Sequence, residues 1–180
     1  MIGYDLLATA SFGLESLVAA ELSELGIGRR TVENGHVRFA GAAADIARCN
    51  VRLRTADRIF VVLAEFPAPD FDALFEGVRG IDWRALAPRD AAITVNARSS
   101  ASRLASVPAV QSVAKKAIVA SLTGNRPGAR LAETGPVVDA EIWLSADRAT
   151  VMLDATGEGL HKRGYRTGTG EAPLRDNLAA

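Results

Sequence analysis

The residues whose types best suit chemistry lie near the end of the chain, in the run Leu160-His161-Lys162-Arg163-Gly164-Tyr165-Arg166. This run places an imidazole, a phenol ring and three cations within seven residues. Aromatic rings stack on nucleic-acid bases and cations bind phosphates, so the mixture favours nucleic-acid contact and is unusual for a buried core. The candidate contacts are His161, Lys162, Arg163, Tyr165 and Arg166. The same residues also suit a linker packed between two domains, and both interpretations stay open.

A second positively charged segment spans residues 91–132, which contain no Asp or Glu although the whole chain has a net charge of zero. Because uncompensated cations attract the nucleic-acid backbone, we select five of its cations as candidate phosphate contacts. They are Arg98, Arg103, Lys115, Lys116 and Arg126, and Arg130 lies in the same segment. Arg98 and Arg103 flank a serine-rich loop that leads into a predicted helix, whose N-terminus favours anions. The alternatives are an ordinary exposed loop and, for the two lysines, the solvated face of that helix.

A search for an enzyme site finds no candidate. The sequence contains neither a Walker-type phosphate loop nor a Gly-x-Gly-x-x-Gly fingerprint, and neither of its two histidines lies in a motif that activates a serine. Those histidines, His36 and His161, are too far apart in sequence to assemble zinc spacing with the single cysteine, Cys49. We therefore expect no catalytic residue, metal or cofactor in this chain, and we expect Cys49 to pack in a core.

Length and composition limit the class of protein. With 180 residues, 48% of them apolar, the chain can bury a core in one ordinary domain or two small ones. The apolar runs, such as residues 59–64, are far too short to cross a bilayer. The N-terminus lacks the basic start of a secretion signal. We expect a cytoplasmic protein that has no contact with a membrane.

Residues 1–66 alternate in a pattern typical of an α+β fold. Alternating or buried apolar runs predict strands at 4–10, 29–32, 36–40 and 58–66, and helical periodicity predicts helices at 13–25 and 42–53. The dipeptide Asn34-Gly35 suits a tight hairpin turn between the second and third strands. The order β-α-β-β-α-β is that of a ferredoxin-like unit, in which two helices cover one face of an antiparallel sheet.

A second α/β region follows the proline-rich stretch at residues 67–69. We expect Asp70 to cap a helix through residue 78, then a short helix at 81–86, a strand at 91–97, a helix at 108–122 and strands at 138–144 and 150–154. Trp143 falls on the outward face of its strand, where it either stacks on a base or packs against a helix or a neighbouring domain. Pro173 starts a helical pattern that stops at Ala180, so we expect a longer protein.

Several of these motifs together resemble the N-terminal region of bacterial THUMP-containing RNA methyltransferases. The motifs are Ser11-Phe12-Gly13-Leu14-Glu15, Ile81-Asp82-Trp83, Glu141-Ile142-Trp143-Leu144, the run from Leu153 to Arg166, and Ala172-Pro173-Leu174. The resemblance is to the enzymes that methylate guanine N2 in 23S ribosomal RNA. It implies a ferredoxin-like domain at 1–66, a THUMP domain at 67–166, and at 167–180 a linker with the truncated start of a methyltransferase domain.

The resemblance also implies a function. The THUMP domain would capture structured RNA, ribosomal rather than transfer RNA, for a C-terminal methyltransferase domain in cis that uses S-adenosylmethionine (SAM). This chain lacks that family's Gly-rich cofactor loop and its Asn/Asp-Pro-Pro-Tyr motif, so no catalytic or cofactor-binding residue is carried over. The run 160–166 then becomes an ordered strap between RNA-binding and catalytic domains. Two alternatives remain: the THUMP region of a tRNA-modifying enzyme, and a ferredoxin-like regulatory module that binds a small ligand or a partner protein.

Overall fold

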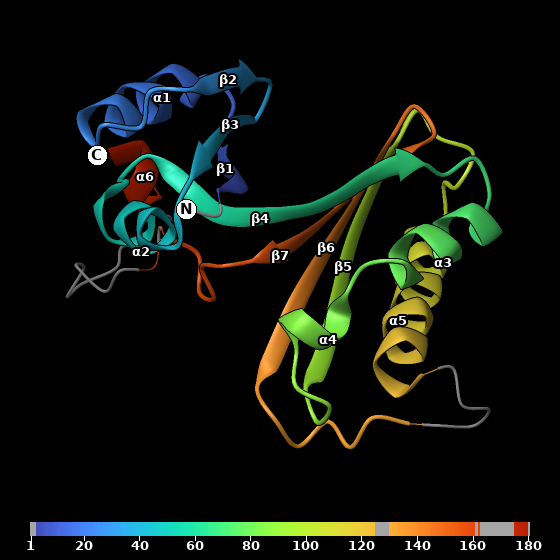
Figure 1. Cartoon of the computed structure of the whole chain (residues 1–180). Helices are drawn as coiled ribbons and strands as arrows, with labels where there is room; N and C mark the ends of the chain where they lie inside the picture. The colour runs from blue at the N-terminus through green and yellow to red at the C-terminus, as the bar shows by residue number, and fades with distance from the viewer. Residues whose placement is uncertain (1–2, 125–129, 161, 163–174, 180) are drawn as a thin grey trace, which may run out of the picture. The chain divides into compact units, whose positions relative to one another are not determined.

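The chain folds into two compact units (Figure 1). The structure, a computed structural model, describes residues 3–124, 130–160, 162 and 175–179. The first unit comprises residues 1–62 and 154–180, and the second comprises residues 63–153. Seven strands of the described residues follow the order β2 (Arg30–Glu33), β3 (His36–Gly41), β1 (Tyr4–Ala10), β4 (Ala56–Pro67), β7 (Arg148–Asp154), β6 (Val137–Ser145) and β5 (Ala92–Ser100). Strand β4 contributes residues to both units. The fold is therefore mixed α+β, as the sequence predicts.

The first unit has the predicted β-α-β-β-α-β order. Its elements are β1 (Tyr4–Ala10), α1 (Glu15–Glu24), β2 (Arg30–Glu33), β3 (His36–Gly41), α2 (Ala43–Arg52) and the first part of β4 (Ala56–Pro67); α6 (Asp176–Ala179) follows near the end of the chain. The central strand β1 pairs antiparallel with β3 and β4. Alternate strand residues such as Leu6, Ala8 and Phe39 face α1 and α2, where Leu22 and Cys49 complete a buried core.

The β2–β3 turn is tied to the start of α1 by one carboxylate. Gly35 adopts the left-handed conformation, with φ at 78°, which a glycine tolerates without strain. The Glu15 carboxylate accepts hydrogen bonds from the backbone N–H groups of Gly13 and Gly35, both at 2.8 Å. These hydrogen bonds lower the pKa of Glu15, and the bond from the Gly35 N–H makes the largest contribution. A single side chain thus links the predicted Asn34-Gly35 turn to the segment that leads into α1.

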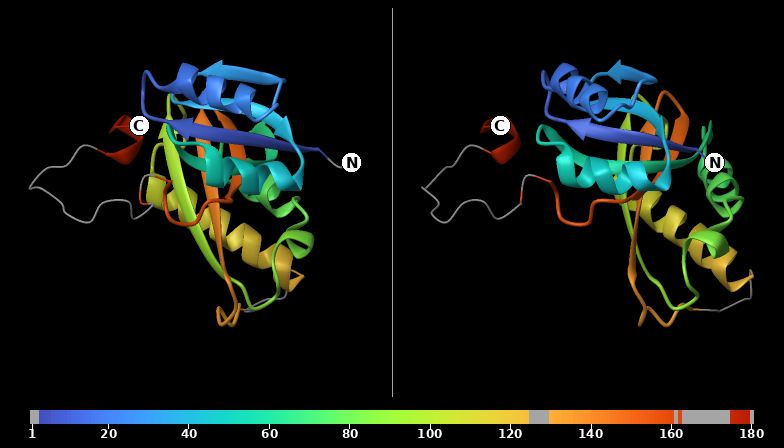
Figure 2. Two further views of the ribbon diagram at one scale, coloured as in Figure 1. Left: turned by 90° about the vertical axis from the view of Figure 1, so that its left-hand side faces the viewer. Right: turned by 60° about the vertical axis from the view of Figure 1, so that its left-hand side comes forward.

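The second unit places three helices on one face of its strands. It contains the end of β4, then α3 (Phe71–Arg79), α4 (Trp83–Leu86), β5 (Ala92–Ser100), α5 (Val107–Thr123), β6 (Val137–Ser145) and β7 (Arg148–Asp154). Asp70 caps α3 as predicted, because its carboxylate accepts from the Ala73 N–H at 2.8 Å. Strands β5 and β6 are parallel, and β6 and β7 form an antiparallel hairpin. Figure 2 shows α5 lying along these strands.

The helical face of the second unit is fully buried. Ile142 and Leu144 of β6 pack beneath Ala114 and Ile118 of α5. Trp83 of α4 has no exposed surface, and its indole N–H donates to the carbonyl of Val78 at 2.7 Å. Because that hydrogen bond satisfies the only polar atom of the side chain, the indole can be buried at little polar cost.

The segment after β7 belongs with the first unit rather than the second. Ala155 N–H donates to Ile59 O at 2.9 Å, and Leu160 N–H donates to Asp57 O at 2.9 Å. Arg58 pairs with Asp154, and Leu160 is 8% exposed within the first unit's core. The range 67–166 expected for the second domain therefore includes residues 154–160, which the structure groups differently. Backbone pairing to β4 decides this grouping, and strand periodicity does not reveal it.

Gly77 offers a test of the second core. A Cβ added there would lie 2.2 Å from the ring of Phe66, closer than atoms approach in proteins. Gly77→Ala gains about 1 kcal/mol of helix propensity but overpacks the core by about 1–3 kcal/mol. We expect a net loss of stability in urea unfolding followed by circular dichroism. Gly28→Ala is the control because its Cβ meets nothing within 4 Å; a Gly77→Ala chain as stable as the wild type would contradict this packing.

Cys49 provides a pH-dependent prediction. The thiol is fully buried, and burial, with a smaller contribution from Asp45, raises the pKa of Cys49 to about 11. The folded chain therefore holds the thiol proton more tightly than the unfolded chain, whose cysteine titrates near about 8.5. This contribution is complete below that value and is lost as the pH rises towards 11. Stability should fall more steeply between pH ~8.5 and about 11 in the wild type than in Cys49→Ala. Equal slopes in the two chains would argue against the shift.

Candidate nucleic-acid interface

Arg98 lies within β5 rather than beside a loop. The strand continues through the serine-rich segment to Ser100, because its last residues pair with β6 as far as Ser145. Arg98 is opposite Trp143 in this register, and its guanidinium carbon lies 3.1 Å from the centroid of the indole ring. Desolvation lowers the pKa of Arg98, while Glu141 raises it. A guanidinium stays charged under such shifts, so this is a cation–π contact.

Trp143 faces away from the helical core, as the strand alternation predicts. Its neighbours Ile142 and Leu144 point to the opposite face, where the helices lie. Trp143 therefore does not pack against α5, which lies on the other face of the strands. Its indole N–H donates to a carboxylate oxygen of Glu141 at 2.9 Å, and Arg98 covers one face of the ring. The indole is thus held in place by two charged groups on the sheet surface.

Arg103 is held by the β6–β7 turn. Ala146 and Asp147 both have positive φ, at 48° and 59°, and they form a two-residue hairpin loop between Ser145 and Arg148. The Asp147 carboxylate accepts from the backbone N–H of Arg103 at 2.7 Å and lies 3.5 Å from its guanidinium. The guanidinium side chain is nevertheless 76% exposed. Arg103 remains accessible, but part of its charge is compensated.

Lys115 and Lys116 lie on the outer face of α5, opposite Ala114 and Ala117, which are in the core. Lys116 is exposed, and its ammonium lies 5.9 Å from the Phe75 ring. Lys115 pairs with Glu133 at 2.8 Å, although 44% of its side chain is exposed. Lys116 is therefore exposed as predicted, whereas Lys115 is only partly exposed and has an acidic partner.

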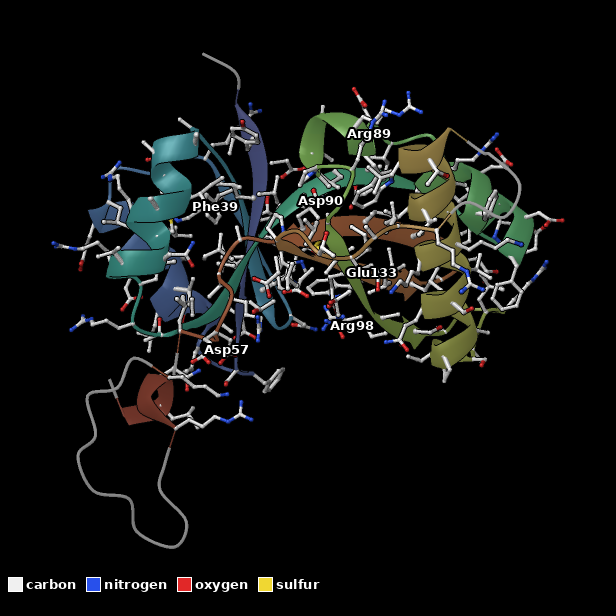
Figure 3. The ribbon with its side chains drawn as sticks, turned by 90° about the horizontal axis from the view of Figure 1, so that it is seen from below. Phe39, Asp57, Arg89, Asp90, Arg98 and Glu133 are labelled. Carbon is white, nitrogen blue, oxygen red and sulfur yellow. The ribbon has the colours of Figure 1, made fainter. Side chains whose placement is uncertain are left out.

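The acid-free segment is therefore not acid-free in space. Glu133, Glu141 and Asp147 all lie outside residues 91–132, yet each approaches a cation inside that range. Sequence reasoning missed them because charge was counted along the chain. The cations also do not converge, since Arg98 lies on one face of the sheet and α5 covers the other. Figure 3 shows Arg98 and Glu133 among the side chains.

The candidates in the terminal run fall largely outside the described residues. His161, Arg163, Tyr165 and Arg166 lie there, as does Arg126 of the acid-free segment, and their contribution to RNA contact stays a prediction. Lys162 is described: it is exposed, and its backbone N–H donates to Gly159 O at 2.8 Å. Because Lys162 alone among residues 161–166 is described, the structure favours neither nucleic-acid contact nor a packed linker for this run.

Among the described residues, no group of three His, Cys, Asp or Glu side chains could hold a metal ion. No helix in the described part of the chain is long and apolar enough to span a membrane. The sequence offers no Gly-rich loop for SAM, so the residues present do not fit that cofactor.

Comparison with known proteins identifies both units. A family model described as the RlmL ferredoxin-like domain matches residues 5–60, and one described as the THUMP domain matches residues 68–154. These two domains, expected from the resemblance, are thereby confirmed.

Full-length relatives extend well beyond this chain. The Bacillus subtilis protein named "Putative RNA methyltransferase YpsC" is 46% identical over 98% of this chain and 46% of its own length. "Ribosomal RNA large subunit methyltransferase K/L" of Methylococcus capsulatus is 36% identical over 98% of this chain and 24% of its own. The crystal structure of SMU.472, described as "a putative methyltransferase complexed with SAH", superposes on this chain with a TM-score of 0.91 and is 44% identical in sequence. The match covers 99% of this chain and 48% of the SMU.472 chain. The chain spans less than half the length of each.

The Lys115–Glu133 pair gives a charge-release test. Glu133→Gln should change stability by less than about 1 kcal/mol, because the pair is partly solvated. It should also free Lys115 for polyanions, so the variant should elute from a heparin column at higher salt than Glu158→Gln. Glu158 is an exposed acid of the first unit, and its variant makes the same change of charge. Identical elution of the two variants would show that freeing Lys115 adds nothing beyond net charge.

Proposed function

The chain joins an RlmL ferredoxin-like domain to a THUMP domain and so belongs with the THUMP-containing RNA methyltransferases, and from that premise we propose that it docks structured RNA for methylation. The proposed target is 23S ribosomal RNA and the proposed modification is at guanine N2. The name of the Methylococcus capsulatus relative, a large-subunit ribosomal RNA methyltransferase, supports the ribosomal target. The guanine N2 position is supported by the sequence resemblance.

The observation that carries the proposal is the combination of a THUMP domain with cations exposed on its surface, such as Arg103 and Lys116. Such a surface can hold phosphates, which fixes the position of an RNA without reading its sequence. Because the exposed cations of the described residues are spread over both units and the net charge is zero, the affinity should be modest and strongly dependent on salt. RNA docking is therefore a positioning function.

The methylation itself is proposed for a C-terminal domain of the full-length protein. That domain would bind SAM, as suggested by the crystallised relative described as complexed with SAH. No residue of this chain is assigned to the cofactor or to methyl transfer. The docked RNA would be presented to that domain in cis, in the cytoplasm.

The two lysines of α5 test the proposal. In Lys115→Glu with Lys116→Glu, two positive charges that face solvent become negative. We expect RNA affinity to fall at least about tenfold and the salt slope of log K to decrease by about 1–2, because Lys115 is already paired with Glu133. Fluorescence anisotropy with a labelled ribosomal RNA hairpin at two salt concentrations measures both quantities.

The matched control reverses two exposed arginines of the first unit, Arg29→Glu with Arg52→Glu. If the lysine variant binds as well as the wild type, α5 does not contact the phosphates. Competition between unlabelled ribosomal RNA and transfer RNA decides the substrate class. Preference for transfer RNA would favour the tRNA-modifying alternative. Absence of all RNA binding, together with ligand-dependent thermal stabilisation, would favour the regulatory module.

A further inference from the structure

Three arginines from separate segments line one hollow in the second unit. Arg84 lies in α4, Arg89 in the connection to β5, and Arg130 in the segment before β6. The hollow has a volume of about 430 Å³, and its wall is completed by Leu122, Thr123, Gly124 and Leu131. All three arginines are exposed, and none of the lining residues is acidic. Sequence reasoning did not select this group, because its members are scattered along the chain.

The hollow is built around the C-terminal end of α5. Arg84 Nε donates to the carbonyl of Ser121 at 3.2 Å, which satisfies one of the carbonyls that a helix end leaves unpaired. The helix stops at Gly124, whose φ is 72°. A Cβ at Gly124 would lie 2.9 Å from Arg84 Nη2, so the glycine leaves room for the guanidinium. Local geometry thus holds Arg84 at the wall by Nε and leaves its Nη groups for another partner.

The charges of this group have no acidic partner in the described part of the chain, although the carbonyl end of α5 offsets part of the charge of Arg84. Within the described residues, no carboxylate pairs with Arg84, Arg89 or Arg130, whereas Arg103 and Lys115 each have an acidic partner. The neighbouring Asp90 carboxylate lies within 2.8 Å of the position that a Gly135 side chain would occupy, and it does not line the hollow. Figure 3 labels Arg89 and Asp90. Like charges held around one hollow repel each other, and an anion between them relieves that repulsion.

We infer that this hollow binds the phosphate backbone of the docked RNA through Arg84, Arg89 and Arg130. The inference rests on the proposed function, to which it adds a second phosphate contact at the C-terminal end of α5. Guanidinium groups bind phosphate oxygens with two parallel hydrogen bonds, so three of them around a polar hollow suit a phosphodiester better than a base. The contact is separate from the other candidates. The 17 residues of α5 span about 25 Å and separate the hollow from Arg103, which precedes the helix.

The test uses the 180-residue chain and a variant with Arg89→Gln and Arg130→Gln. Arg84 is kept because it bonds to α5. Anisotropy with a labelled RNA hairpin that carries a single-stranded tail should show binding about tenfold weaker and a salt slope smaller by about 1–2. The control is Arg29→Gln with Arg148→Gln, which removes two charges from other exposed sites. It should weaken binding less than about threefold.

The outcomes separate this inference from the proposed function. If the wild type binds RNA and the two double variants lose affinity equally, the hollow is not the contact, while RNA docking stands. If the wild type does not bind RNA, the proposed function itself fails. Calorimetric titration with inorganic pyrophosphate is a second measurement, and it distinguishes a phosphate of the RNA backbone from that of a small molecule. Binding of pyrophosphate to the wild type but not to the Arg89/Arg130 variant would make the ligand a small phosphorylated molecule and overturn the assignment to the RNA backbone.

Discussion

The parallel pairing of β5 with β6 is the constraint on which the second unit depends. Two parallel neighbours cannot be joined by a tight turn, so the chain must cross over the sheet, and α5 makes that crossing. The apolar stripe of α5, including Val110 and Ile118, is buried on the sheet. Burying such a side chain contributes about 1.5–3 kcal/mol, so the helix has one stable orientation. That orientation turns Lys115 and Lys116 outward and places the arginine hollow at the helix C-terminus.

Charge in this protein is organised in space rather than along the chain. The longest stretch without acids contains Arg103 and Lys115, and both meet carboxylates that the fold brings from elsewhere. Arg84 and Arg89 precede that stretch and have acidic residues beside them in sequence, yet no carboxylate pairs with them in the described part of the chain. Local density of positive charge is thus a weak guide to where an anion binds. The site of anion binding depends instead on which carboxylates the turns and strand ends bring near each cation.

The secondary structure was largely predictable because its signals are local. Alternation along β6 and the helical stripe of α5 each follow from burial of one face, and Asp70 and Gly35 mark a helix start and a turn through their own geometry. The extension of β5 through Ser100 was not predictable, since serines are common in loops. Only pairing with β6 as far as Ser145 holds that segment in a strand.

By itself, the sequence determined the order of the elements, the ferredoxin-like pattern of the first unit and the resemblance to THUMP-containing methyltransferases, because each rests on spacing within a short window. Tertiary structure alone decided the grouping of residues 154–160 with the first unit, the Lys115–Glu133 pair and the hollow formed by Arg84, Arg89 and Arg130. Arg84 and Arg130, the two that lie furthest apart in sequence, are separated by about half the length of the second unit. Their approach follows from the packing of α4 and α5 on the sheet, which no local pattern encodes.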